Sequence, residues 1–138
     1  MPFVLDTNIV SELRKGFGRC HPNVWRWYDA TPTDEIYLSV LVLGEMRRGV
    51  EMKRKRDPET ARIFERWLHE VVLIHRERIM PVTFEICDVW GRLAAGAPIS
   101  TVDGLIAATA VHRGFTVATR NTADFQRTGV DYINPFEA

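Results

Sequence analysis

Four acidic side chains in this sequence stand beside short apolar runs, at places where a carboxylate could take part in chemistry. Asp6 directly follows the first apolar run, and Glu45 lies about one turn into the helical stretch after the second. Asp103 opens an apolar helix, and Asp124 comes shortly after the apolar run to which that helix leads. In a parallel α/β sheet the carboxyl ends of the strands share one edge, where ligands bind. We therefore expect the four acids to lie close together.

Carboxylates gathered in one place repel each other, and a divalent cation relieves that repulsion. Two such charges about 4 Å apart cost roughly 4 kcal/mol at an effective dielectric constant of 20. Oxygen ligands are those that Mg²⁺ and Mn²⁺ prefer, whereas no histidine or cysteine stands at a spacing that zinc would need. An all-carboxylate site suits phosphate-ester hydrolysis by a metal-activated water. We expect such a site, with all four acids as metal-binding and catalytic residues.

Each acid also has a simpler interpretation when it is taken singly. Asp6 can cap the helix that starts at Thr7, and Asp124 can serve the start of its own short helical turn. Ser100 and Asp103 have the spacing of a capping box, although with Asp in place of the usual Glu. Glu45 can be a solvated helix residue. The capping interpretation and the metal interpretation both remain open at this stage.

Polar, uncharged side chains accompany the acids at the same strand ends. They are expected to orient the carboxylates and bound waters from a second layer around the metal. These residues are Thr7, Asn8, Ser39, Thr119 and Asn121.

Motifs for rival chemistries are missing from the sequence. It contains no GxxxxGK[ST] phosphate-binding loop, no GxSxG nucleophile elbow and no HExxH zinc helix. Cys20 and Cys87 are far apart and lack CxxC spacing, so we expect reduced thiols rather than a disulfide or a zinc site.

Strand-like and helix-like segments alternate along the whole chain, which predicts a single α/β domain over residues 1–138 with a parallel sheet. Helices are expected at 7–14, 22–30, from 43 onward, 57–75, 84–95, 100–113 and 122–126. The helical crossover between 43 and 75 is long enough to form an antiparallel helix pair that projects from the sheet. Strands are expected at 3–5, 35–40, 78–82, 115–119 and 131–134, the third at an edge because Pro81 cannot donate a ladder hydrogen bond.

The composition places few limits on binding partners. Among 138 residues, 46% are hydrophobic and 26% charged, and 18 basic residues balance 18 acidic ones, so any nucleic-acid surface must be local. The apolar run at the start is too short for a signal peptide, and no apolar stretch has the length of a membrane span. We expect a soluble, cytoplasmic protein that makes no membrane contact.

One local basic cluster could contact RNA phosphates and make binding depend on salt. It could equally be the solvated end of a helix, where basic residues are favoured. The cluster consists of Arg47, Arg48, Lys53, Arg54, Lys55 and Arg56. A second surface is suggested by Trp25, Trp27 and Tyr28, which are hard to bury together on one helix, so that one of them is a candidate for partner contact.

Four segments resemble PIN-domain proteins, in the right order and spacing and over essentially the whole chain. The resemblance is nearest to VapC-type toxins of bacterial toxin–antitoxin pairs, including the FitB-like branch with its closing N-P-F. The matching segments are LDTNIVSEL, SVLVLGEMRRGV, STVDGLIAATAVHRG and VATRNTADF.

This resemblance implies a PIN-like three-layer fold, with a central parallel sheet of about five strands between helices. It also implies a Mg²⁺- or Mn²⁺-dependent endoribonuclease that acts on tRNA or rRNA. Its acids would be Asp6, Glu45, Asp103 and Asp124. Some relatives carry an acid where this chain has Asn121, so either Asp124 supplies the fourth charge or the site works with three acids.

Members of this family are inhibited by a cognate antitoxin, and they form homodimers that assemble into larger toxin–antitoxin complexes. The resemblance therefore implies the same partner and the same assembly for this chain. The helix pair between 43 and 75 could form a groove with the first helix for such an antitoxin. The alternative is a catalytically inactive PIN-like module that binds RNA or protein.

Overall fold

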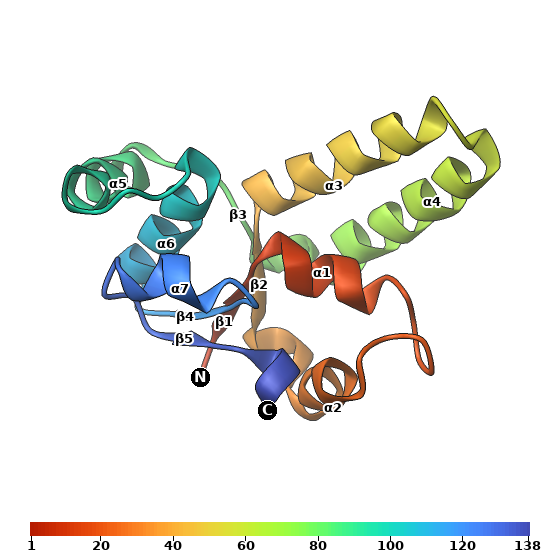
Figure 1. Cartoon of the computed structure of the whole chain (residues 1–138), viewed down its shortest axis with the longest axis horizontal. Helices are drawn as coiled ribbons and strands as arrows, with labels where there is room; N and C mark the ends of the chain where they lie inside the picture. The colour runs from red at the N-terminus through yellow and green to blue at the C-terminus, as the bar shows by residue number, and fades with distance from the viewer.

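A five-stranded parallel sheet forms the centre of the structure, a computed structural model that describes residues 1–138. The strand order is β3-β2-β1-β4-β5, so β1 lies in the middle (Figure 1). Each strand pairs in parallel with its neighbours. The strands are β1 (Phe3–Leu5), β2 (Ile36–Ser39), β3 (Ile79–Met80), β4 (Thr116–Ala118) and β5 (Tyr132–Ile133). The expected α/β fold class, with its sheet of about five parallel strands, is confirmed.

The direction in which the chain crosses the sheet reverses between β1 and β4. The first three strands run outward to one edge, and the chain then returns to place β4 against the other side of β1. In open α/β sheets a crevice forms at such a reversal, beyond the carboxyl ends of the strands. Asp6 and Thr119 are the residues that directly follow β1 and β4.

Helices cover both faces of the sheet, and the order of elements matches the alternation expected from the sequence. The principal helices are α1 (Thr7–Leu13), α2 (Pro22–Ala30), α3 (Val40–Arg54), α4 (Pro58–Ile74), α5 (Phe84–Gly96), α6 (Thr101–Arg113) and α7 (Thr122–Gln126). Three short 3₁₀ turns complete the chain: η1 (Thr33–Glu35), η2 (Arg76–Arg78) and η3 (Pro135–Glu137).

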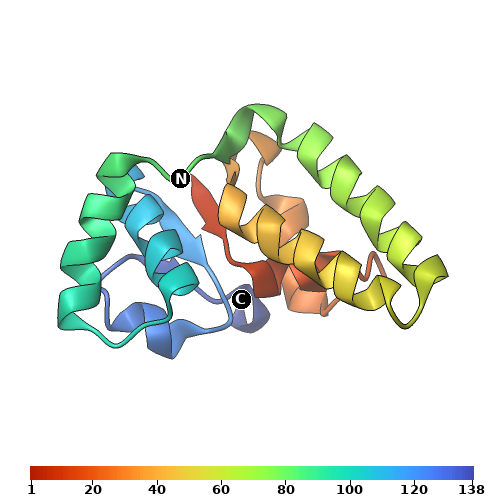
Figure 2. The same cartoon turned by 90° about the horizontal axis from the view of Figure 1, so that it is seen from above.

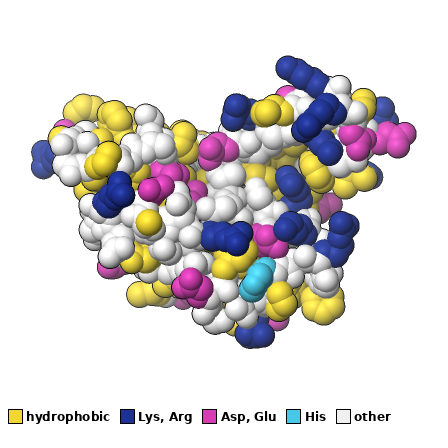
Figure 3. Space-filling model, in the orientation of Figure 1, with side chains coloured by type: hydrophobic (Ala, Val, Ile, Leu, Met, Phe, Trp, Pro, Cys, Tyr) yellow, Lys and Arg dark blue, Asp and Glu magenta, His cyan; other side chains and the backbone are white.

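Helices α3 and α4 lie side by side and extend away from the sheet as an arm, as expected for this crossover (Figures 1 and 2). Helices α5 and α6 pack together on the opposite side. The surface is hollowed between the arm and the α5–α6 lobe, and acidic side chains gather there (Figure 3). The hollow lies above the reversal point of the sheet.

Apolar side chains from the strands and from one face of each covering helix form a single core. Val4, Leu38 and Val117 supply its sheet layer, and Ile106 and Phe125 pack on it from α6 and α7. No single helix has the length and apolar character needed to cross a membrane. Helices α5 and α6 have that length and composition only when they are taken together, and they form a pair bent by 119°.

Local signals explain where the helices begin and end. Helix α3 starts three residues before the expected position, because the Ser39 hydroxyl accepts a hydrogen bond from the Leu41 amide at 3.1 Å and caps the helix inside an apolar run. The third strand is shorter than expected, and it does lie at the sheet edge. Gly114 ends α6 in the left-handed conformation, with φ of 70°, which glycine adopts without a steric penalty.

Replacing Gly114 by Ala should lower the free energy of unfolding by about 1 kcal/mol, because the left-handed conformation is unfavourable for a residue with a Cβ atom. Gly91→Ala provides the matched control. Gly91 lies inside α5, and a Cβ there meets open space, so alanine should stabilise the helix by up to about 1 kcal/mol. Urea unfolding of both variants measures the difference, and equal effects would contradict this account of the helix end.

Candidate active site at the reversal point of the sheet

The carboxylate of Asp6 lies buried at the end of the central strand, with 4% of the residue exposed. One oxygen accepts the Thr7 amide at 2.8 Å, so Asp6 is the N-cap of α1. The other accepts the Thr119 hydroxyl at 2.8 Å and the Asn8 side-chain amide at 3.1 Å. The Asp6 amide is itself bound to the Ala118 carbonyl at 2.9 Å. The capping interpretation is therefore correct for Asp6, but it does not account for the second oxygen.

Glu45 reaches the same place from α3. The Thr7 hydroxyl donates to its Oε1 atom at 2.5 Å, while the Thr7 amide holds Asp6. Val42 and Met46 bury the opposite side of α3 in the core, which leaves Glu45 exposed toward the site. Thr7 therefore connects the first two acids, although they are 39 positions apart in the sequence.

Asn121 connects the other two acids to the same network. Its side-chain amide donates to Asp124 at 2.6 Å and to Asp103 at 3.4 Å, and its backbone amide donates to the Thr119 hydroxyl at 2.9 Å. Because Thr119 in turn donates to Asp6, all four acids belong to one hydrogen-bonded network. The sequence prediction that the acids meet at one edge agrees with this geometry.

The residues expected to assist the acids differ in what they do. Thr7, Asn8, Thr119 and Asn121 each hydrogen-bond to one or more of the four carboxylates. Ser39 does not: its hydroxyl caps α3 and makes no hydrogen bond to an acid. It acts at a distance, since it fixes the start of the helix that carries Glu45.

The electrostatics of the cluster are unfavourable without a cation. Burial raises the pKa of Asp6 to about 6; the Thr119 hydrogen bond opposes the rise, and the charges of Asp103 and Glu45 add to it. Burial likewise raises the pKa of Asp103, and the charge of Asp124 contributes to that rise. None of the four acids forms an ion pair with a lysine or arginine. The cluster therefore lacks positive charge.

The donor set fits a hydrated divalent cation better than a fully enclosed one. No group of three or more carboxylate, histidine or cysteine side chains converges closely enough to form a ready-made cage. Mg²⁺ keeps several of its waters and is commonly bound by one or two carboxylates. Asp6 and Asp103 repel each other and are both partly or wholly withdrawn from solvent, so they are the pair best suited to direct contact.

The basic cluster on the arm is divided into two groups. Arg47 and Arg54 both bind Glu65, at 2.6 and 3.0 Å, and both also bind Glu51. The other four basic residues form no ion pair, which leaves them available for phosphate. They are Arg48, Lys53, Lys55 and Arg56.

Arg120 is a residue near the site that the sequence analysis did not identify. Its backbone amide donates to the Asn8 side chain at 3.1 Å, and its guanidinium lies 4.5 Å from the centre of the Phe136 ring. Arg120 could have been identified from the sequence, because it directly follows Thr119 in the segment that leads to Asp124.

Comparison with known proteins places these observations in context. The family model described as "PIN domain" matches residues 3–131. The chain is 38% identical to VapC ribonuclease Y4jK of Sinorhizobium fredii over 97% of each chain, and 31% identical to toxin FitB of Neisseria gonorrhoeae over 96% of this chain and 97% of that one. The solved structure of FitAcB from Neisseria gonorrhoeae has a TM-score of 0.90, with 27% identity over 99% of both chains. The structure of FitAB bound to an IR36 DNA fragment has a TM-score of 0.86, with 28% identity over 97% and 95% of the two chains.

The buried Asp6 carboxylate predicts that the metal-free protein loses stability as the pH rises from about 4 to 6. In this window the folded state binds more protons than the unfolded state, because the pKa of Asp6 is raised from 3.8 to about 6. The free energy of unfolding should fall by up to about 3 kcal/mol across it. Asp6→Asn should flatten the fall, as measured by urea unfolding in EDTA.

Asp29→Asn, at an exposed position on α2, is the control and should keep the wild-type profile. Strong destabilisation of Asp6→Asn at pH 7 would mean that the capping hydrogen bonds outweigh the repulsion.

Proposed function

This chain belongs to the PIN-domain family, and from that premise we propose that it is a metal-dependent endoribonuclease toxin that a cognate antitoxin inhibits. The observation that carries the proposal is the hydrogen-bonded network of four carboxylates without a counter-charge, at the reversal point of the sheet. Relatives named as ribonucleases support hydrolysis of RNA. The four acids are assigned here as catalytic residues.

Asp6 and Asp103 hold the ion, Mg²⁺ or Mn²⁺, in this proposal. When bound, the ion supplies a positive charge that stabilises the phosphate and lowers the pKa of a water molecule. Glu45, which is exposed, and Asp124, which is half-buried, would accept hydrogen bonds from surrounding waters and the proton of the attacking one.

The uncharged residues of the network keep these carboxylates in position. Thr7 holds Asp6 and Glu45 at a fixed separation, and Asn121 does the same for Asp103 and Asp124. Attack of water on phosphorus breaks the bond to the 3′ oxygen, so the products carry a 5′-phosphate and a 3′-hydroxyl.

The partners follow from the same premise. Solved structures similar to this chain are of FitAB and VapBC pairs, some of them bound to DNA. We assign an antitoxin as the partner of this chain, with a homodimer of the toxin as the unit that assembles further.

RNA, with tRNA or rRNA as the substrate class, approaches the acids along the arm of α3 and α4, where the unpaired basic residues lie. We assign the protein to the cytoplasm, where such an RNA substrate would be met.

Asp6→Asn and Asp103→Asn should each lower the rate of Mg²⁺-dependent RNA cleavage by more than about 100-fold, because even the groups behind metal ligands contribute 10- to 100-fold. Asp88→Asn, on α5 and paired with Arg92 at 3.2 Å, is the control and should retain the wild-type rate. Sequencing of RNA ends after brief expression identifies the substrate and the product ends. Products with 2′,3′-cyclic phosphates would contradict the proposed hydrolysis, and no cleavage of any RNA with Mg²⁺ or Mn²⁺ would indicate the inactive binding module.

Binding of RNA should depend on salt through the four unpaired basic residues of the arm. Replacing Arg48, Lys53, Lys55 and Arg56 together by Ala should reduce the slope of log K against log salt by up to about 3, at roughly 0.7 per phosphate contact on a single strand. The variant Arg47→Ala/Arg54→Ala is the comparison from the same helix, and it should change the slope less because Glu51 and Glu65 already neutralise these arginines. An unchanged slope in the fourfold variant would remove the arm from the RNA-binding surface.

A further inference from the structure

Arg120 brings a positive charge to the edge of the acid network without neutralising it. It directly follows Thr119, whose hydroxyl donates to the buried Asp6 carboxylate, and its own side chain is exposed. It forms no ion pair with any acid of the protein. A guanidinium beside carboxylates that lack positive charge would ordinarily pair with them, so another contact holds this one in place.

That contact is with the ring of Phe136. The guanidinium lies 4.5 Å from the ring centre, a distance at which a cation is attracted to the face of an aromatic ring. The ring is itself fixed, because the Phe136 carbonyl accepts the Asn23 side-chain amide at 2.8 Å and its amide donates to the Asn134 side chain at 3.0 Å. The His21 ring packs edge-on with it, with the centres 5.2 Å apart. The turn η3 therefore supports Arg120.

Asn8 fixes the backbone of Arg120 relative to Asp6. Its side-chain oxygen accepts the Arg120 amide at 3.1 Å, while its side-chain nitrogen donates to Asp6 at 3.1 Å. One side chain thus connects an acid that is assigned to the ion with the residue that carries the free cation. Arg120 is held twice, at its backbone by the acid network and at its guanidinium by Phe136.

An arginine held in this way is suited to bind a phosphate. The contact with Phe136 occupies one side of the guanidinium and leaves the N–H donors on the other side in solvent. Arginine presents its donors in a planar fork that matches the geometry of a phosphate. Successive phosphates of a strand are only about 3.4 Å apart along its axis. When the phosphate to be cleaved lies at the acids, its neighbours are therefore close to Arg120.

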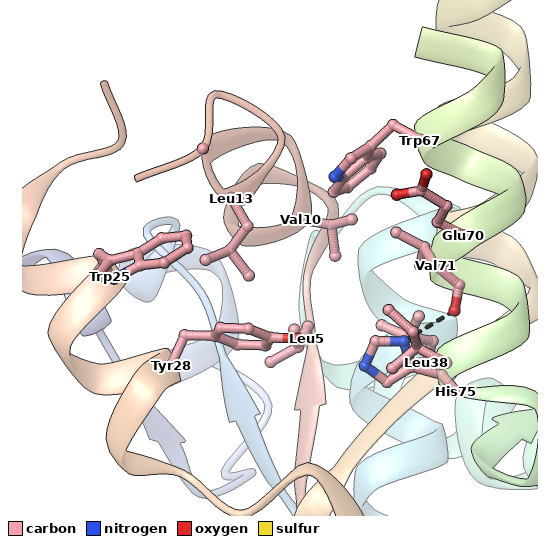
Figure 4. A pocket seen from close by; sticks show the side chains of 12 residues that line it. Leu5, Val10, Leu13, Trp25, Tyr28, Leu38, Trp67, Glu70, Val71 and His75 are labelled. Atoms are coloured by element: carbon pink, nitrogen blue, oxygen red, sulfur yellow. Dashed lines mark hydrogen bonds between the residues drawn. The ribbon is translucent and has the colours of Figure 1, made fainter. Parts of the chain in front are cut away.

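The apolar cavity between α1, α2 and α4 does not offer this chemistry. It has a volume of about 210 Å³, and nine of its 12 lining residues are hydrophobic, with no lysine or arginine among them. Trp25 and Tyr28 line it from α2 and Trp67 from α4 (Figure 4). Trp25 and Tyr28 are half-buried there, as is Trp27 elsewhere on α2, so the expectation that one of the three is exposed is wrong.

We propose that Arg120, supported by Phe136, binds the RNA phosphate next to the one that is cleaved and so places the scissile bond at the acids. The inference rests on the proposed function, because it needs RNA as the substrate. Arg120 is then a substrate-binding residue, and Phe136 is a positioning residue that acts through it.

The salt dependence of RNA binding tests the phosphate contact. The probe is a short, fluorescently labelled single-stranded RNA of mixed sequence, bound in EDTA to proteins that carry Asp103→Asn, so that the RNA remains intact. Arg120→Ala should reduce the slope of log K against log salt by about 0.7, as expected for one phosphate contact on a single strand. Arg120→Lys should keep the slope, because the charge remains.

Arg113→Ala is the matched control for this measurement. Arg113 is also exposed and lies over aromatic rings, those of Tyr37 and Phe115, but it is about 15 Å along α6 from Asp103. Its replacement should leave the slope unchanged. An unchanged slope in Arg120→Ala, even with weaker binding, would overturn the phosphate contact, and so would an equal change in Arg113→Ala.

A double-mutant cycle tests the role of Phe136. Phe136→Leu should weaken RNA binding by up to about fivefold, because the ring no longer holds the guanidinium, whereas Phe136→Tyr should retain the wild-type affinity. In the Arg120→Ala background, Phe136→Leu should have no further effect. A loss that comes only from disturbed packing of η3 would persist in that background and would overturn the role assigned to Phe136.

These binding measurements are independent of catalysis. RNA that is bound through Arg120 but is not cleaved with Mg²⁺ or Mn²⁺ would contradict the proposed nuclease activity and leave the role of Arg120 in place. RNA cleavage at the wild-type rate by Arg120→Ala, together with an unchanged salt slope, would overturn the role of Arg120 and leave the nuclease activity in place.

Discussion

The hydrogen bond from the Thr119 hydroxyl to the buried Asp6 carboxylate joins the ends of two neighbouring strands at the point where the sheet reverses. It is the link between the pair Asp6 and Glu45 and the pair Asp103 and Asp124. Asp6 caps α1 and so presents Thr7 to Glu45, and Thr119 accepts the Asn121 amide and so presents Asn121 to Asp103 and Asp124. Five parallel strands would form a sheet without this bond, but the acids would not share one network.

The same bond keeps a carboxylate where it lowers the stability of the metal-free fold. Burial opposes the charge on Asp6, and two neighbouring acids add to the opposition. Capping of α1 requires neither the burial of Asp6 nor the nearby charges of Glu45 and Asp103. The arrangement is that of a site whose strain is relieved when a ligand binds, which is where natural proteins commonly tolerate unfavourable groups.

Local signals in the sequence were sufficient to predict most helices and strands. They were less informative about contacts between segments that are distant in the sequence. Helix α2 begins at Pro22 and ends at Ala30 as expected, because Pro fits the first turn and Thr31-Pro32 ends it. The convergence of the acids was predictable from the parallel sheet alone. The pairing of Arg47 and Arg54 with Glu65 was not, since it depends on how α4 folds back along α3. The apolar cavity between α1, α2 and α4 was not predictable either, because its lining also includes Leu5 of β1 and Leu38 of β2, which come from distant parts of the chain.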